Sequence, residues 1–139
     1  VNIGSTQTIR INYSVRNDSI TVTPAQFQVG FYLSRDNVIT PNAAAGSDLL
    51  LGSVQIGSPQ IPALAPGATT GNLILDITLP AATNSYWGGD QTYYIGMYID
   101  TDNQVAESIE VNNTAVAPIN ITGTLNPDVV GGGLSVAQL

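Results

Sequence analysis

The chain has 139 residues, with three Lys or Arg against ten Asp or Glu and neither His nor Cys, so its formal net charge is −7. Without Cys and His, a disulfide framework, thiolate or imidazole metal ligands, thiol nucleophiles and Ser-His catalysis are all excluded. The negative charge disfavours nucleic acid and anionic lipid as partners, and no apolar run approaches the length of a membrane span, so we expect neither nucleic-acid binding nor membrane insertion.

Alternation of apolar and polar residues with a period of two runs through most of the chain and predicts β-strands. In chain order, the predicted strands are residues 9–16, 27–34, 50–56, 73–79, 93–100 and 116–121, with a weaker candidate at 20–22. Between them lie clusters of Asn, Asp, Gly and Pro that favour tight turns, at residues 17–19, 35–37, 65–67, 87–90 and 100–103.

The strand pattern also predicts the fold class. No segment has the spacing of an amphipathic helix that would cover a parallel sheet, so the strands are expected in two antiparallel sheets packed face to face. We therefore predict an all-β fold, an immunoglobulin-like β-sandwich of about seven strands. The residues predicted to form its core are Ile9, Ile11, Val15, Phe27, Val29, Phe31, Leu33, Leu75, Ile77, Ile95, Ile99 and Ile119.

Five segments, in order, carry a family resemblance. They are Asn-Tyr-Ser-Val-Arg-Asn at 12–17, Val-Gly-Phe-Tyr-Leu-Ser-Arg-Asp at 29–36, Asp-Leu-Leu-Leu-Gly at 48–52, Tyr-Tyr-Ile-Gly at 93–96, and the stretch from Asp100 to Thr114. Together they resemble the CARDB domain, the cell-adhesion-related domain found in bacteria, and the resemblance extends over residues 5–122. The resemblance implies an immunoglobulin-like module of a larger secreted or surface protein of bacteria or archaea, with an adhesive or spacer role. Its partners would be neighbouring modules of the same chain or other surface proteins.

The two ends of the chain depart from that family pattern. Members of the family open with a strand similar to Pro-Asp-Leu-Val-Val, which is missing before residue 5, whereas Asn-Pro-Asp-Val-Val at 126–130 and Leu-Ser-Val at 134–136 resemble it. We therefore divide the chain into a domain at 1–123 and a tail at 124–139 that resembles the first strand of a following module. One interpretation is that residues 126–136 supply the missing edge strand by head-to-tail exchange between molecules. The alternative is a boundary segment with a flexible Gly-Gly-Gly linker.

The acidic stretch after the fifth strand suggests a calcium site. Asp100, Asp102 and Glu107 supply carboxylate oxygens, the ligands that Ca²⁺ prefers. The spacing is not that of an EF-hand, because Val105 and Val111 stand where its Gly and its bidentate Glu belong. The alternative is that Asp102 and Asn103 form side-chain turns at the end of a strand while Asn112 and Asn113 shape the following hairpin or bulge, in which case no cofactor is bound.

Aromatic residues suggest a ligand-binding surface as a second hypothesis. Trp87 and Tyr86 precede a Gly-Gly pair and are candidates for stacking on a glycan, with Tyr32, Tyr94 and Tyr98 on the polar side of their strands extending the platform. The alternative is that Trp87 closes one end of the core and the tyrosines cover sheet surface.

Catalysis is not expected from this composition. The only remaining general acids and bases are carboxylate pairs, Glu107 with Glu110 or Asp100 with Asp102, and these lie within one connection rather than across a cleft. We predict a non-catalytic extracellular structural or adhesion module, with a glycan-binding or calcium-dependent module as the alternative.

Overall fold

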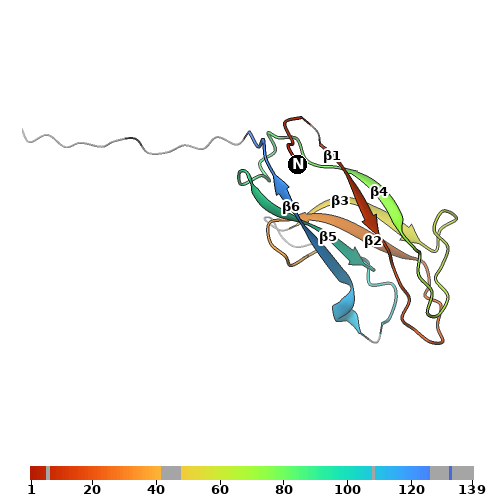
Figure 1. Cartoon of the computed structure of the whole chain (residues 1–139). Helices are drawn as coiled ribbons and strands as arrows, with labels where there is room; N and C mark the ends of the chain where they lie inside the picture. The colour runs from red at the N-terminus through yellow and green to blue at the C-terminus, as the bar shows by residue number, and fades with distance from the viewer. Residues whose placement is uncertain (6, 42–47, 108, 126–131, 133–139) are drawn as a thin grey trace, which may run out of the picture.

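The computed structural model describes residues 1–5, 7–41, 48–107, 109–125 and 132. This part of the chain contains six strands and one short 3₁₀ turn (Figure 1). They are β1 (Thr8–Tyr13), β2 (Phe27–Ser34), β3 (Leu49–Ile56), β4 (Leu73–Thr78), β5 (Gln91–Ile99), η1 (Glu110–Asn112) and β6 (Thr114–Ile121). Each strand lies in a segment predicted from alternation, so the prediction of an all-β fold is confirmed.

The strands form two antiparallel sheets. Four of them are ordered β3-β2-β5-β6, and the other sheet consists of β1 and β4 alone. Figure 1 shows the β1–β4 pair crossing in front of the larger sheet, the arrangement of a sandwich. Among the described residues there are therefore six strands rather than about seven. The segment at 126–136, predicted to supply a further strand, lies outside the described residues except for Gly132.

The weaker strand candidate at 20–22 is wrong. This segment has no ladder partner and forms a bend, because nearby side chains satisfy its backbone groups instead. The Asn17 amide donates to the carbonyl of Val22 at 2.8 Å, and the Val22 N–H donates to the Ser19 hydroxyl oxygen at 2.9 Å. The turn predicted at 17–19 thus extends through residue 22.

Two hydrophobic clusters fill the space between the sheets. One is centred on Phe31, whose ring meets the edge of Tyr13 with ring centroids 4.9 Å apart. The other is centred on Trp87 and Tyr93, whose rings are nearly perpendicular with centroids 5.0 Å apart. The fully covered members of these clusters include Val29, Phe31, Leu33, Ile56, Leu79, Tyr93 and Ile121.

Half of the predicted core is only half-buried. Val15, Phe27, Val29, Phe31, Leu33 and Ile77 are buried as predicted. The remaining predicted core residues, which are Ile9, Ile11, Leu75, Ile95, Ile99 and Ile119, stay partly accessible to solvent. A sheet of two strands is too narrow to cover a sheet of four, so the inner face of the larger sheet is left partly open.

The outer face of the larger sheet is covered at its centre, which corrects the expectation that Tyr32 is exposed. Tyr32 is 4 % exposed and Ile39, from the connection after β2, is 7 % exposed. Ile39 occupies the space above Gly96, where a Cβ atom would overlap its side chain. The Tyr32 ring and the Thr101 side chain both lie over Gly30, so Tyr32 is buried despite the polar-side position that alternation alone assigns to it.

The two ends of the described domain meet at one pole of the sandwich (Figure 1). Asn2 forms a parallel bridge with Thr122, with the Ile3 N–H donating to the Thr122 carbonyl at 2.9 Å and the Thr122 N–H donating to the Val1 carbonyl at 2.9 Å. The Asp90 carboxylate accepts hydrogen bonds from the Thr124 N–H at 2.9 Å and from the Gly123 N–H at 3.1 Å.

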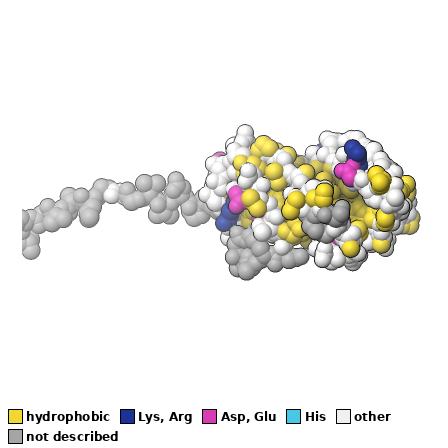
Figure 2. All heavy atoms as spheres, turned by 90° about the horizontal axis from the view of Figure 1, so that it is seen from below, with side chains coloured by type: hydrophobic (Ala, Val, Ile, Leu, Met, Phe, Trp, Pro, Cys, Tyr) yellow, Lys and Arg dark blue, Asp and Glu magenta, His cyan; other side chains and the backbone are white. Residues whose placement is uncertain are grey.

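Charged side chains are sparse on the surface. Figure 2 shows a face of the molecule where hydrophobic and uncharged polar atoms are interspersed, with few acidic or basic side chains. This agrees with a chain in which only 9 % of residues are charged. The described part of the chain holds no helix with the length and apolar character needed to cross a bilayer.

Candidate functional site

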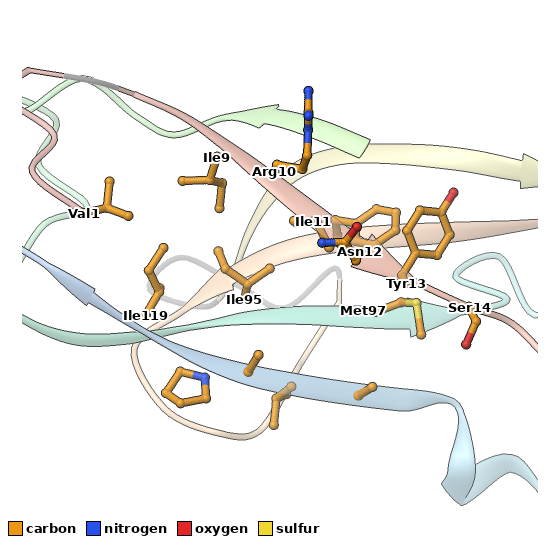
Figure 3. Close-up of a pocket in the computed structure, with 15 residues that line it drawn as sticks. Val1, Ile9, Arg10, Ile11, Asn12, Tyr13, Ser14, Ile95, Met97 and Ile119 are labelled. Carbon is orange, nitrogen blue, oxygen red and sulfur yellow. The ribbon is translucent and has the colours of Figure 1, made fainter. Parts of the chain in front are cut away.

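An apolar groove of about 740 Å³ opens between β1 and β6, the edge strands of the two sheets (Figure 3). One wall is β1 from Ile9 to Tyr13, and the other is β6 from Ala115 to Ile119. The floor is formed by Phe31, Ile95 and Met97, the last two on β5, and Val1 lies at one end. In Figure 3, Ile95 and Ile119 point from the larger sheet toward β1, while Arg10 points away from them.

The strand register explains why this groove is open. Directly opposite residues of an antiparallel pair share one face of the sheet, and Ala117 lies opposite Ile95 while Ala115 lies opposite Met97. The two alanines therefore face the interior of the sandwich, yet both are exposed. No described strand stands above them, and their methyl groups are too small to fill the gap.

Both walls of the groove are strand edges. Within the described residues, β1 pairs only with β4, so its second edge has N–H and C=O groups available. β6 pairs with β5, and its second edge is occupied at its end, where the Val1 amino group donates to the Asn120 carbonyl. The edge of β6 is blunted by Pro118, because a proline fits a paired strand where its nitrogen faces away from the neighbour and offers no N–H there. The edge of β1 has no proline along its length.

An exposed ion pair lies on the outer face of β1. The guanidinium of Arg10 donates to both carboxylate oxygens of Asp76 on β4, at 2.7 Å and 2.8 Å. The hydrogen bond from Arg10 lowers the pKa of Asp76, and the same pair raises the pKa of Arg10. Since this pair points away from the groove, it leaves the inner face of β1 entirely apolar.

The acidic loop after β5 is organised by turn hydrogen bonds. Asp100 is 4 % exposed and has a positive φ of 54°. One of its carboxylate oxygens accepts the Gln104 N–H at 2.8 Å, and the other accepts the Val105 N–H at 2.7 Å. Asp102 is exposed and Glu107 is half-buried. The loop is therefore held together by Asp100, whereas the turn alternative assigned this role to Asp102 and Asn103.

A metal ion does not fit this loop as it stands. In the ranges the structure describes, no three acidic side chains gather where they would hold a cation. Both Asp100 oxygens already accept N–H groups, so an ion at this loop would share the carboxylate with the backbone and would find no gathered set of further carboxylates among the described residues. The proposed carboxylate pair Asp100–Asp102 likewise has one member committed to the backbone.

Trp87 and Tyr86 are packed into the end of the core. Trp87 is 1 % exposed, its indole N–H donates to the Ala81 carbonyl at 2.9 Å, and its ring contacts Tyr93 edge-on. The Tyr86 hydroxyl donates to the Leu33 carbonyl at 2.7 Å, and the Arg35 guanidinium lies 4.8 Å from the centre of its ring. Burial, reinforced by the charge of Asp48, raises the pKa of Tyr86 to about 12.

These contacts leave no open aromatic face at Trp87 for a sugar to stack on. Together with the covered Tyr32, they break up the aromatic platform that the sequence suggested. The structure thus separates the predicted site residues into two groups, the acidic loop with Asp100 and the end of the core with Tyr86 and Trp87. These three side chains make hydrogen bonds within the fold.

Sequence reasoning missed the groove itself. Ile9, Ile11, Ile95 and Ile119 were assigned to a closed core, and Ala115 and Ala117 were not considered at all. A signal was present, because Ala115, Ala117, Ile119 and Ile121 alternate as one apolar face whose side chains shrink toward the start of the strand.

Comparisons with known proteins agree on the family. The model of the CARDB family matches residues 2–117. Among solved structures, the chain is similar to the CARDB domain of a Pyrococcus furiosus protein, crystallised in complex with di-metal ions. The two are 17 % identical with a TM-score of 0.55, and the match covers 88 % of this chain and 78 % of that one, so the likeness concerns the fold. No curated protein matches the chain.

Proposed function

Because the chain belongs to the CARDB family, we propose that it acts as a non-catalytic structural or adhesion module of a larger bacterial or archaeal protein, outside the cell or on its surface. The family assignment supports an adhesion-related role. The absence of catalysis, the extracellular location and the arrangement in tandem modules are parts of this proposal.

The observation that carries the proposal is the contrast between the groove and the polar candidates. Asp100, Tyr86 and Trp87 make hydrogen bonds that hold the fold together, whereas the groove presents exposed apolar side chains beside the available edge of β1. Apolar surface beside a strand edge is suited to contact with another polypeptide.

The experiment that tests this role is an attachment assay. Beads coated with the full chain are mixed with cells of the source organism, and bead attachment is counted against beads coated with heat-denatured chain. The proposal predicts attachment of the folded chain that survives removal of low-molecular-weight ligands by dialysis. Equal attachment of folded and denatured chain would contradict an adhesive role. Labelling of intact cells with an antibody to the chain tests the location, and labelling only after lysis would contradict it.

A metal-dependent contact is the second candidate, because the similar Pyrococcus furiosus domain was crystallised with di-metal ions. In this chain the acidic loop with Asp100, Asp102 and Glu107 is the only sequence candidate we identified for Ca²⁺. Asp100 already binds the backbone, and the described residues gather no set of three carboxylates that would hold an ion there. We therefore propose that the module works without a metal, and a calcium-dependent attachment in the bead assay would favour the second candidate.

A further inference from the structure

We propose that the groove between β1 and β6 binds an extended strand, residues 126–136 of a second copy of this chain, which pairs antiparallel with the free edge of β1. The added strand would turn the two-stranded sheet into one of three strands. Copies joined in this way connect head to tail. This inference concerns how copies associate and stands whether or not the module is adhesive.

The shape of the groove is better suited to an extended strand than to a small ligand. Its lining runs along β1 from Ile9 to Ser14 and along β6 from Ala115 to Ile119, so it is an elongated channel parallel to both strands. Four residue steps of a strand span about 13 Å, which is enough for two or three side chains that point the same way. A strand in this channel would cover Ala115 and Ala117, the inward-facing residues that are now exposed.

The strand edges favour β1 as the partner. An added strand needs a continuous row of backbone donors and acceptors, and β6 lacks a donor at Pro118. Pairing with β1 also continues the existing β1–β4 sheet, and antiparallel ladders are somewhat more stable per residue than parallel ones.

As a strand, the C-terminal segment would have one apolar face, formed by its even-numbered residues, that fits the groove. Fourteen residues follow Leu125, the residue at which the continuous described part of the chain ends. Along residues 126–136, the even positions from 130 onward are Val130, Gly132, Leu134 and Val136, while the odd positions carry Val129, glycines and Ser135. Since alternate side chains of a strand point to opposite faces, the even face is the apolar one and would point into the groove.

A second copy can reach the groove more easily than the same molecule. The described chain leaves β6 at the Val1 end, where Asp90 binds Gly123 and Thr124 and the Leu125 N–H donates to the Ala82 carbonyl at 2.9 Å. A strand antiparallel to β1 must enter at the other end, beside Ala115. Seven residue steps separate Thr122 from Ala115, a distance of about 23 Å, whereas the five steps from Leu125 to Val130 reach about 17 Å at most.

Such contacts join unlike surfaces, the groove of one copy and the tail of the next. An association of this kind forms open chains unless the rotation between copies closes a ring, and in either case its mass grows with concentration. It also predicts complementation: a copy with a blocked groove and a copy with a defective tail each lack one half of the contact, and together they form a pair that cannot extend.

The test is analytical ultracentrifugation of the full chain and four variants over a range of concentrations, in about 0.5 M salt so that repulsion between the negative copies is screened. Ala117→Arg blocks the groove, and Thr114→Arg is its control on the same strand, because Thr114 is exposed and does not line the groove. Leu134→Asp disrupts the apolar face of the tail, and Ser135→Asp is its control on the opposite face.

We expect the weight-average mass of the unmodified chain, T114R and S135D to rise with concentration, while A117R and L134D stay at the monomer mass. A 1:1 mixture of A117R and L134D is expected to level off at about twice the monomer mass. Circular dichroism melts verify that each variant is folded, and Ala115→Arg replaces A117R should that variant not fold.

The opposite results overturn the proposal. A monomer at every concentration means that either the tail enters its own groove or the groove stays empty. Association of L134D equal to that of S135D means that another surface joins the copies. A mixture of A117R and L134D that remains monomeric rules out the groove-to-tail contact.

Discussion

Truncating two opposite residues, Leu33 on β2 and Ile95 on β5, measures directly how open the sandwich is. The two residues are paired in register and share the inner face of the larger sheet. Leu33 is fully buried, whereas Ile95 is half-buried at the floor of the groove. Leu33→Ala and Ile95→Ala each remove three carbon atoms, so the chemistry of the change is matched and the surroundings differ.

The expected costs follow from burial. Removing three buried methylene equivalents costs about 2.4 kcal/mol in transfer free energy, and the closed cavity left at Leu33 raises the total to about 3–4 kcal/mol. At Ile95 part of the side chain already meets solvent and the groove admits water, so the transfer cost is reduced to about 1.5–2 kcal/mol and no cavity cost is added. The account therefore predicts a difference of about 1–2 kcal/mol between the two variants.

Urea unfolding followed by tryptophan fluorescence is the assay, because Trp87 is the single tryptophan and is buried in the folded state. The protein is kept dilute so that copies do not associate. Comparable slopes of free energy against urea for both variants show that the unfolded states are equivalent. A cost at Ile95 equal to that at Leu33 would refute the reasoning, because it would mean that the groove is filled and dry in the isolated chain.

Three further predictions concern Asp90 at the pole where the chain ends meet, Gly96 on the outer face of the larger sheet, and Asp100 in the acidic loop. Hydrogen bonds from the Thr124 side chain and backbone lower the pKa of Asp90 in the folded state, so its stabilising effect is present above the ordinary carboxyl pKa of 3.8 and is lost as the pH falls through the lowered value. Urea midpoints measured from pH 6 down to about pH 2 should therefore fall less steeply in Asp90→Asn than in the unmodified chain, and parallel curves would contradict this role. Gly96→Ala places a Cβ against Ile39 and should cost about 1–3 kcal/mol, with Ile39→Ala in the same chain restoring part of the loss, whereas additive costs would exclude the contact. Because the Asp100 carboxylate is bound to the backbone, the thermal midpoint should be the same in calcium and in chelator, and a rise of several degrees in calcium would establish a bound ion.

The sequence was sufficient to predict the strands, because alternation is a local property of each segment. The pattern from Phe27 to Ser34 reproduces β2 to the residue, and the other strands agree within a few positions at their ends. The end of β1 shows the limit: alternation continues to Arg16, but the ladder with β4 stops at Tyr13 and resumes only as a single bridge between Arg16 and Thr69.

The burial of each face was less predictable, because it depends on which elements cover it. Tyr32 alternates as a polar-side residue, yet it is buried, and its ring lies over Gly30 together with the side chain of Thr101. Ile95 and Ile119 alternate as core residues, yet the narrow β1–β4 sheet leaves them half-exposed. In both cases the answer depends on tertiary coverage by a distant segment, which a pattern within one strand does not contain.

The residue types suggested turn chemistry in the acidic loop and a core position for Trp87 as alternatives to ligand binding. The structure has turn hydrogen bonds in that loop, made by Asp100 rather than by Asp102 and Asn103, and a buried Trp87. The groove depends on the pairing of β6 with β5, which brings Ala117 opposite Ile95, and on the absence of a described strand beside β1. Neither fact follows from local sequence.

The central claim, that the free edge of β1 accepts a strand from another copy, is tested most directly by amide hydrogen exchange measured at low and at high protein concentration. Alternate N–H groups of β1, those that do not bond to β4, are predicted to exchange more slowly as the concentration rises, while the outer edge of β6 around Pro118 is unaffected. Exchange in β1 that does not change with concentration, or protection that appears at β6 instead, would contradict the claim.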